Sequence, residues 1–100
     1  MLRTTRKVLT VICEAGLESR LTEDLIRLGA RGYTVTDARG RGSRGVRNAA
    51  WDTAANIRLE VVCEEHIAQK IAEHLQERYY DNFAMILFSA TVEVLRPEKF

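Results

Sequence analysis

Hydrophobic and polar positions alternate along the chain in blocks that predict four strands and two helices. Short apolar runs of strand length occupy Lys7–Cys13, Tyr33–Ala38, Asn56–Cys63 and Met85–Leu95. Between them, apolar residues recur at helical spacing in two stretches, Leu17–Leu28, which ends at Gly29, and Ile67–Tyr79. This order predicts an α+β, ferredoxin-like βαββαβ fold, with a four-stranded antiparallel sheet and two helices on one of its faces.

The first and last strands carry apolar residues on both of their faces. A sheet face in contact with water does not need large apolar side chains, and an exposed apolar patch of this size usually marks an interface. We therefore predict that the face left open by the helices is buried in subunit contacts. The residues assigned to that face are Leu9, Val11, Met85 and Leu87.

One segment, Arg39–Arg47, reads R-G-R-G-S-R-G-V-R and holds four arginines and three glycines. Arginine presents a planar fork of donors to phosphate or carboxylate, and glycine lets the backbone approach a ligand closely. Together with the single acid Asp52, the stretch 39–55 carries a local charge of +3, while the whole chain carries only +1. A sequence pI near 7.8 does not fit a broad nucleic-acid-binding face. A compact anion-binding site fits better. The bound anion could be a nucleotide phosphate, a nucleic-acid backbone or an acidic partner protein.

Length and composition favour one domain that covers residues 1–100. No apolar run approaches the roughly 20 residues of a membrane span, and Met1–Lys7 lacks a signal-peptide apolar segment, so we expect a cytoplasmic protein without membrane insertion. The sequence offers no Ser/His/Asp grouping or paired-carboxylate motif, and we expect no enzymatic activity. The first and third strands hold no aromatic residue, which argues against an RNA-recognition module.

The cysteines and histidines do not form a recognisable motif. Cys13 and Cys63 belong to no C-x-x-C pair, so a zinc site has no support. We expect both to be free buried thiols, although they would end adjacent strands taken to be parallel and could then lie close together. His66 and His74 lie eight residues apart with polar neighbours and are interpreted as solvated surface residues.

Two motifs in succession, G-Y-T-V at Gly32–Val35 and G-x-G-S-R-x-V-R at Gly40–Arg47, resemble the PII-like proteins. The branch most similar to them is the one associated with inorganic-carbon uptake and carboxysomes. The resemblance covers nearly the whole chain, from the βαββαβ order to a last strand at Phe83–Phe88. The insertion between the second and third strands, about residues 39–55, corresponds to the mobile T-loop of that family.

The resemblance implies a homotrimer that binds an adenine nucleotide in the clefts between subunits and signals through its T-loop to inorganic-carbon metabolism. It places Arg44 and Arg47 on the nucleotide phosphates. The T-loop residues Asn48, Trp51 and Asp52 would contact a partner, either a bicarbonate transporter or a carboxysome-related protein. The complete implied nucleotide-binding set is Thr34, Thr36, Arg41, Gly42, Ser43, Arg44, Arg47, Met85, Ile86, Leu87 and Phe88.

Departures from the nitrogen-signalling PII proteins limit the expected ligand. Their T-G-x-x-G-D-G-K phosphate loop has no counterpart at Tyr80–Met85, and no tyrosine occurs between Arg39 and Ala55 that could be uridylylated. We therefore expect AMP or ADP, with cyclic AMP and ATP as alternatives, and bicarbonate as a second anion on the arginines. No cofactor and no metal are expected. The competing hypothesis is a basic-loop adaptor that binds nucleic acid or protein without a small-molecule ligand.

Overall fold

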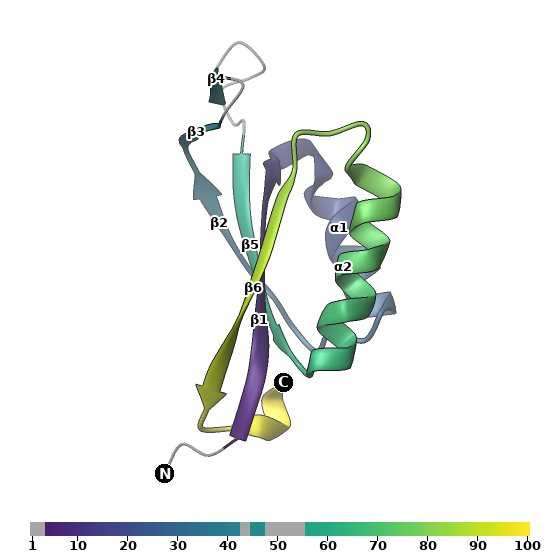
Figure 1. Ribbon diagram of the computed structural model, residues 1–100, viewed down its shortest axis with the longest axis vertical. Helices are drawn as coiled ribbons and strands as arrows, with labels where there is room; N and C mark the ends of the chain where they lie inside the picture. Colours follow the sequence, from purple (N-terminus) through teal and green to yellow (C-terminus); the bar gives the residue numbers. More distant parts are fainter. Residues whose placement is uncertain (1–3, 43–44, 48–55) are drawn as a thin grey trace.

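The computed structural model describes residues 4–42, 45–47 and 56–100. It confirms the predicted α+β fold, with two helices packed on the same side of one sheet (Figure 1). The long elements are β1 (Thr4–Glu14), α1 (Glu18–Arg27), β2 (Thr34–Ala38), β5 (Asn56–Cys63), α2 (Glu65–Tyr79) and β6 (Ile86–Val94). The short elements are the 3-10 turns η1 (Ala15–Leu17) and η2 (Pro97–Lys99) and the strands β3 (Gly40–Gly42) and β4 (Gly45–Arg47).

The main sheet has the strand order β2-β5-β1-β6, and all three neighbouring pairs are antiparallel. β2 and β6 are the edge strands. Helix α1 connects β1 to β2, so these two strands run in the same direction and β5 lies between them in the opposite direction. The second, two-stranded sheet is a hairpin of β3 and β4 that continues from the end of β2 (Figure 1).

One hydrophobic core fills the space between the helices and the sheet. The strands contribute alternate residues, because successive side chains of a strand point to opposite faces. The helices contribute residues at spacings of three and four, which lie on one side of a helix. The most deeply buried core side chains are Leu9, Val11, Cys13, Leu21, Leu25, Ile57, Leu59, Val61, Ile71 and Leu75.

The structure corrects the residues assigned to the open face of the sheet. Leu9 and Val11 are buried in the core beneath the helices, Met85 is buried there as well, and Leu87 packs against the same core. The prediction was wrong because the odd-numbered and the even-numbered residues of these strands are both apolar. The sequence alone therefore did not show which of the two sets faces the helices. The open face carries Ile86 and Phe88 instead, each about half exposed at 50% and 51%, together with the partly buried Val8 and Ile12.

The end of α1 depends on Gly29, as its sequence position suggested. Its φ of 116° lies in the region that side chains rarely adopt, and a Cβ built on it would come within 2.8 Å of Ile67 Cδ1. The turn is closed by backbone bonds from the Gly29 amide to the Ile26 carbonyl and from the Ala30 amide to the Leu25 carbonyl. Gly29 therefore both ends the helix and lets α2 approach it.

Both cysteines are buried thiols, as expected, but they are not close together. β1 and β5 are antiparallel rather than parallel, so Cys13 lies opposite Ile57 while Cys63 lies opposite Lys7. Six residue steps along β5, from Ile57 to Cys63, separate them by roughly 20 Å. Burial raises the pKa of the Cys63 thiol, and the nearby Glu64 carboxylate adds to this effect.

Within the described ranges, neither helix has the length and apolar character needed to cross a bilayer.

Candidate functional site

The arginine-glycine segment begins as a β-hairpin that extends from the end of β2. Its register pairs Gly40 with Arg47, Arg41 with Val46 and Gly42 with Gly45. Three of these six paired positions are glycine, which has no side chain to keep a ligand from the backbone. The register also places Arg41 and Arg47 on the two neighbouring strands of the hairpin, and the guanidinium group of arginine suits an anion.

Several predicted site residues lie outside the residues that the structure describes. They are Ser43, Arg44, Asn48, Trp51 and Asp52. For Arg41, Gly42 and Arg47 the structure gives the strand and the register alone.

β2 presents the predicted residues Thr34 and Thr36 on the exposed side of the sheet edge. Thr34 lies opposite Glu60 and Thr36 opposite Arg58, and the Thr36 hydroxyl donates to the Arg58 carbonyl over a long 3.5 Å. This bond is at the limit of a useful hydrogen bond, so the hydroxyl of Thr36 can turn to another acceptor at little cost.

At the opposite edge, Met85 and the first residues of β6 divide between the two faces. The side chains of Met85 and Leu87 pack into or against the core, so only their backbone groups can contact a ligand. Ile86 and Phe88 present half-exposed side chains on the open face. Of the four predicted nucleotide-binding residues 85–88, two therefore offer an apolar side chain to a ligand.

Two rows of paired residues connect these edges across the open face. One row runs Thr36, Arg58, Ile12, Ile86, and the other runs Thr34, Glu60, Thr10, Phe88. The predicted residues of β2 are thus level with those of β6. Three strand spacings separate them, roughly 14 Å at about 4.8 Å for each spacing.

An ion pair in the middle of these rows was not anticipated. Arg58 Nη2 donates to Glu60 Oε2 at 2.9 Å and Arg58 Nε to the same oxygen at 3.3 Å, and both side chains are well exposed. The sequence had identified Arg58 and Glu60 correctly as the polar side of β5. Their pairing was missed, although it could have been found, because residues two apart on a strand share a face.

A polar cluster between the helices was also missed. Asp24 Oδ2 accepts a hydrogen bond from the Tyr79 hydroxyl at 2.7 Å and lies 3.1 Å from His74 Nε2, while Oδ1 accepts from Arg27 at 2.8 Å. His74 is therefore not the solvated residue that we expected, since its side chain is 18% exposed and faces α1. The exposed His66 does fit that interpretation.

The cluster perturbs two ionisable groups. Burial disfavours the charged carboxylate of Asp24, but the hydrogen bonds from Tyr79, Arg27 and His74 outweigh it and lower the Asp24 pKa below its ordinary value of 3.8. Burial, together with the hydrogen bond to Asp24, raises the pKa of Tyr79 to about 12. At neutral pH, Asp24 is therefore a carboxylate and Tyr79 a neutral phenol. Their hydrogen bond links α1 to α2. Its residues bring no nucleophile or open coordination position together, and across the described ranges no group of three or more potential ligands could hold a metal.

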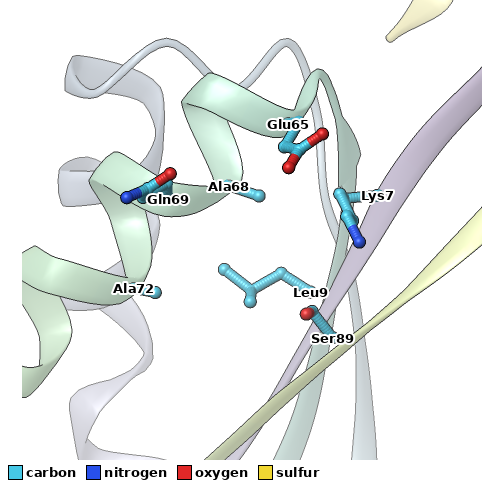
Figure 2. A pocket seen from close by; sticks show the side chains of 7 residues that line it. All are labelled: Lys7, Leu9, Glu65, Ala68, Gln69, Ala72 and Ser89. Atoms are coloured by element: carbon cyan, nitrogen blue, oxygen red, sulfur yellow. The ribbon is translucent and has the colours of Figure 1, made fainter.

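A hollow of about 260 Å³ lies between α2 and the β1–β6 side of the sheet (Figure 2). Leu9 forms its floor, Ala68 and Ala72 form the helix wall, and Lys7 and Glu65 lie together at one end. Its volume is below the roughly 300–1,000 Å³ of ordinary ligand pockets. None of the predicted nucleotide-binding residues lines it, so this hollow is not the predicted site.

Comparison with known proteins places the chain among relatives over almost its full length. The sequence model of the family described as nitrogen regulatory protein P-II matches residues 6–99. A protein from Thermus thermophilus, assigned to the PII-like signaling proteins, is 45% identical, with a TM-score of 0.85 over 100% of this chain and 99% of that one.

Structures of CPII from Thiomonas intermedia K12, a nitrogen regulatory PII-like protein, are similar as well. One, bound to ADP, AMP and bicarbonate, is 25% identical, with a TM-score of 0.87 over 100% of this chain and 98% of CPII. Another, bound to ADP and bicarbonate, is 25% identical, again with a TM-score of 0.87, over 100% and 99% of the two chains.

Proposed function

Because the chain belongs to the nitrogen regulatory protein P-II family, we propose that it is a cytoplasmic regulator that binds an adenine nucleotide and signals through its loop at residues 39–55. Its role is regulation rather than catalysis. The observation that carries this proposal is the position of the arginine-glycine hairpin, which directly follows β2, the strand that carries the exposed Thr34 and Thr36.

AMP or ADP is the favoured ligand. CPII, a relative with the same fold, has been solved with ADP, AMP and bicarbonate. In this chain Arg44 and Arg47 would bind the phosphates, with Arg41, Ser43 and Gly42 alongside them. Charge-assisted hydrogen bonds from arginine contribute roughly 1.5–3 kcal/mol each, so two or three of them suit a ligand with one or two phosphates.

The nucleotide would lie between copies of the chain in a homotrimer. Thr34 and Thr36 are at one edge of the sheet, whereas Ile86 and Phe88 are at the other. The open face between them, which carries the Arg58–Glu60 ion pair as well as Ile12, would be covered when copies assemble, and the opposite edges of neighbouring copies would then meet. A half-exposed Phe88 beside a half-exposed Ile86 supports such an assembly.

The output would concern inorganic carbon. CPII has been solved with bicarbonate as well as with nucleotide, and a small anion of this kind could share the arginine cluster here. The partner, a bicarbonate transporter or a carboxysome-related protein, would contact Asn48, Trp51 and Asp52.

The test is a thermal-shift panel with AMP, cyclic AMP, ADP and ATP, each with and without bicarbonate. AMP or ADP should raise Tm, because a ligand that binds only the folded state stabilises it. The double variant Arg44→Ala/Arg47→Ala should lose this shift yet remain oligomeric, whereas the control Arg78→Ala, at an exposed position of α2, should keep it.

Two outcomes would count against the proposal. No shift with any nucleotide, together with salt-dependent RNA binding, would favour the nucleic-acid adaptor. Equal affinity for ADP with and without bicarbonate would remove the bicarbonate part alone.

A further inference from the structure

The turn between α2 and β6, residues 80–85, is tied by backbone hydrogen bonds to the elements on both of its sides. The Tyr79 carbonyl accepts from the Asn82 amide at 3.1 Å and from the Phe83 amide at 3.0 Å. The Phe83 carbonyl accepts in turn from the Met85 amide at 2.9 Å. The place of Phe83 therefore decides where the backbone enters residues 85–88, which are predicted to bind the nucleotide. The turn lies at the same end of the sheet as the β3–β4 hairpin (Figure 1).

Phe83 anchors this turn through its side chain. Its neighbours Tyr80, Asp81, Asn82 and Ala84 are exposed, whereas Phe83 is partly buried and packs against the core. The backbone of the turn is thus attached to the body of the molecule at Phe83.

Helix α1 holds the same turn from its other side. The Arg20 guanidinium lies over the Phe83 ring, with its Cζ 6.0 Å from the ring centroid, at the outer limit of a cation–π contact. The Phe83 ring also packs on the Tyr79 ring, with centroids 5.9 Å apart and planes tilted by 50°. Tyr79 is itself fixed to α1, since its hydroxyl donates to Asp24 at 2.7 Å. Arg20 and Asp24 are four residues apart and lie on one side of α1, so that side restrains both aromatic rings.

We propose that Phe83 and Arg20 are positioning residues for the nucleotide, an inference that rests on the proposed function. They act through the turn, by holding the backbone of residues 85–88 and the half-exposed side chains of Ile86 and Phe88 where the ligand meets them. When fewer molecules have the turn in place, the apparent affinity falls by the same factor. The turn would thus be a fixed support at the base and ribose, while the arginine-glycine hairpin binds the phosphates.

The test is isothermal titration of the full chain with AMP and with ADP. Arg20→Gln should weaken binding about threefold, the scale of an exposed cation–π contact. Phe83→Leu should weaken it about tenfold, because the aromatic pair with Tyr79 is lost as well. Arg20→Lys keeps a cation for the ring and should stay within about twofold of the parent.

The matched control is Arg27→Gln. Arg27 is also an exposed arginine of α1, and it bonds the other carboxylate oxygen of Asp24 at 2.8 Å. It should bind both nucleotides as the parent does.

A second measurement shows whether the variants act through the turn. In the chain without nucleotide, hydrogen exchange at the Phe83 and Met85 amides should be faster in Arg20→Gln and Phe83→Leu than in Arg27→Gln. The amides of β5 should exchange at the parent rate in all three variants. Equal exchange at the turn in the variants and the control would overturn the proposal, as would faster exchange that extends to β5.

The titrations separate this proposal from the proposed function. If the parent binds AMP or ADP but Arg20→Gln and Phe83→Leu bind as well as Arg27→Gln, nucleotide binding stands and the positioning role alone is overturned. A loss in Arg20→Lys as large as that in Arg20→Gln would remove the role of the cation over the ring. If the parent binds neither nucleotide, the proposed function fails and the positioning role fails with it.

Discussion

The two faces of the sheet use similar apolar residues but differ sharply in burial. On the covered face, Leu9, Val11 and Leu59 are at most 1% exposed beneath the helices. On the open face, Ile86 and Phe88 are about half exposed, and they share the face with the Arg58–Glu60 ion pair. The difference teaches that the apolar content of a strand does not reveal which face forms the core. The packing partner decides, and among the described residues the helices cover only one face of the sheet.

The largest expected effect comes from a cavity on the covered face. Leu59→Ala removes a fully buried side chain between β5 and the helices, and it should lower the free energy of unfolding by about 2–5 kcal/mol. Urea denaturation measures this. The neighbouring open-face variant Glu60→Ala is the control. If both variants cost the same, the two faces do not differ as the structure indicates.

A charge on the open face should act on association rather than on folding. Phe88→Glu places a carboxylate where we propose that copies meet, and burying an unpaired charge costs several kcal/mol. The oligomer should therefore weaken by more than about 100-fold, while the circular dichroism spectrum of the folded chain is kept. Sedimentation velocity of the parent and the variant measures the assembly. A parent that is monomeric at micromolar concentration would contradict the proposed interface.

The polar cluster on the outer side of the covered face should make stability depend on pH. The pKa of Asp24 is lowered in the folded state, so its stabilising effect is present above the ordinary value of 3.8 and is lost as the pH falls through the lowered pKa. Tyr79 acts in the other direction. With its pKa raised to about 12, its contribution is complete below the ordinary value of 10.0 and is lost as the pH rises toward 12.

Asp24→Asn tests this expectation. It should cost about 1–3 kcal/mol at neutral pH, because it replaces a carboxylate that accepts charge-assisted hydrogen bonds, and it should flatten the acid limb of stability against pH. Chemical denaturation between pH 2 and 7 measures both effects. An unchanged acid limb in the variant would mean that other carboxylates dominate acid unfolding.

The sequence predicted the elements well because each has a clear period. The spacing of the leucines in α1 predicts one buried side of a helix. The alternation of Ile57, Leu59 and Val61 in β5 predicts one buried face of a strand, and both elements form as expected. β1 was ambiguous because Val8 and Ile12 are as apolar as Leu9 and Val11, and its face assignment was therefore wrong.

Long-range pairings were less accessible. His74 contacts Asp24 across 50 residues, and no local pattern encodes that contact. The direction of β5 depends on its insertion between two parallel strands, and missing this led to the suggestion that Cys13 and Cys63 could lie close together, although both are buried thiols as expected. The proposed phosphate ligands of the loop rest on the motif and the family, since Ser43 and Arg44 lie outside the described residues.

The smallest expected effect concerns the Arg58–Glu60 pair on the open face. With side chains 47% and 40% exposed, the pair should couple by less than about 1 kcal/mol, because water and salt screen exposed charges. A double-mutant cycle of Arg58→Ala and Glu60→Ala in the Phe88→Glu background measures this coupling in the dissociated chain. The same cycle in the parent should give a larger value, since assembly would remove water from both charges and strengthen their attraction. If the coupling energies are equal in the two backgrounds and both fall with added salt, the Arg58–Glu60 pair stays in water in the assembled protein. The interface would then have to lie nearer the edge that carries Ile86 and Phe88.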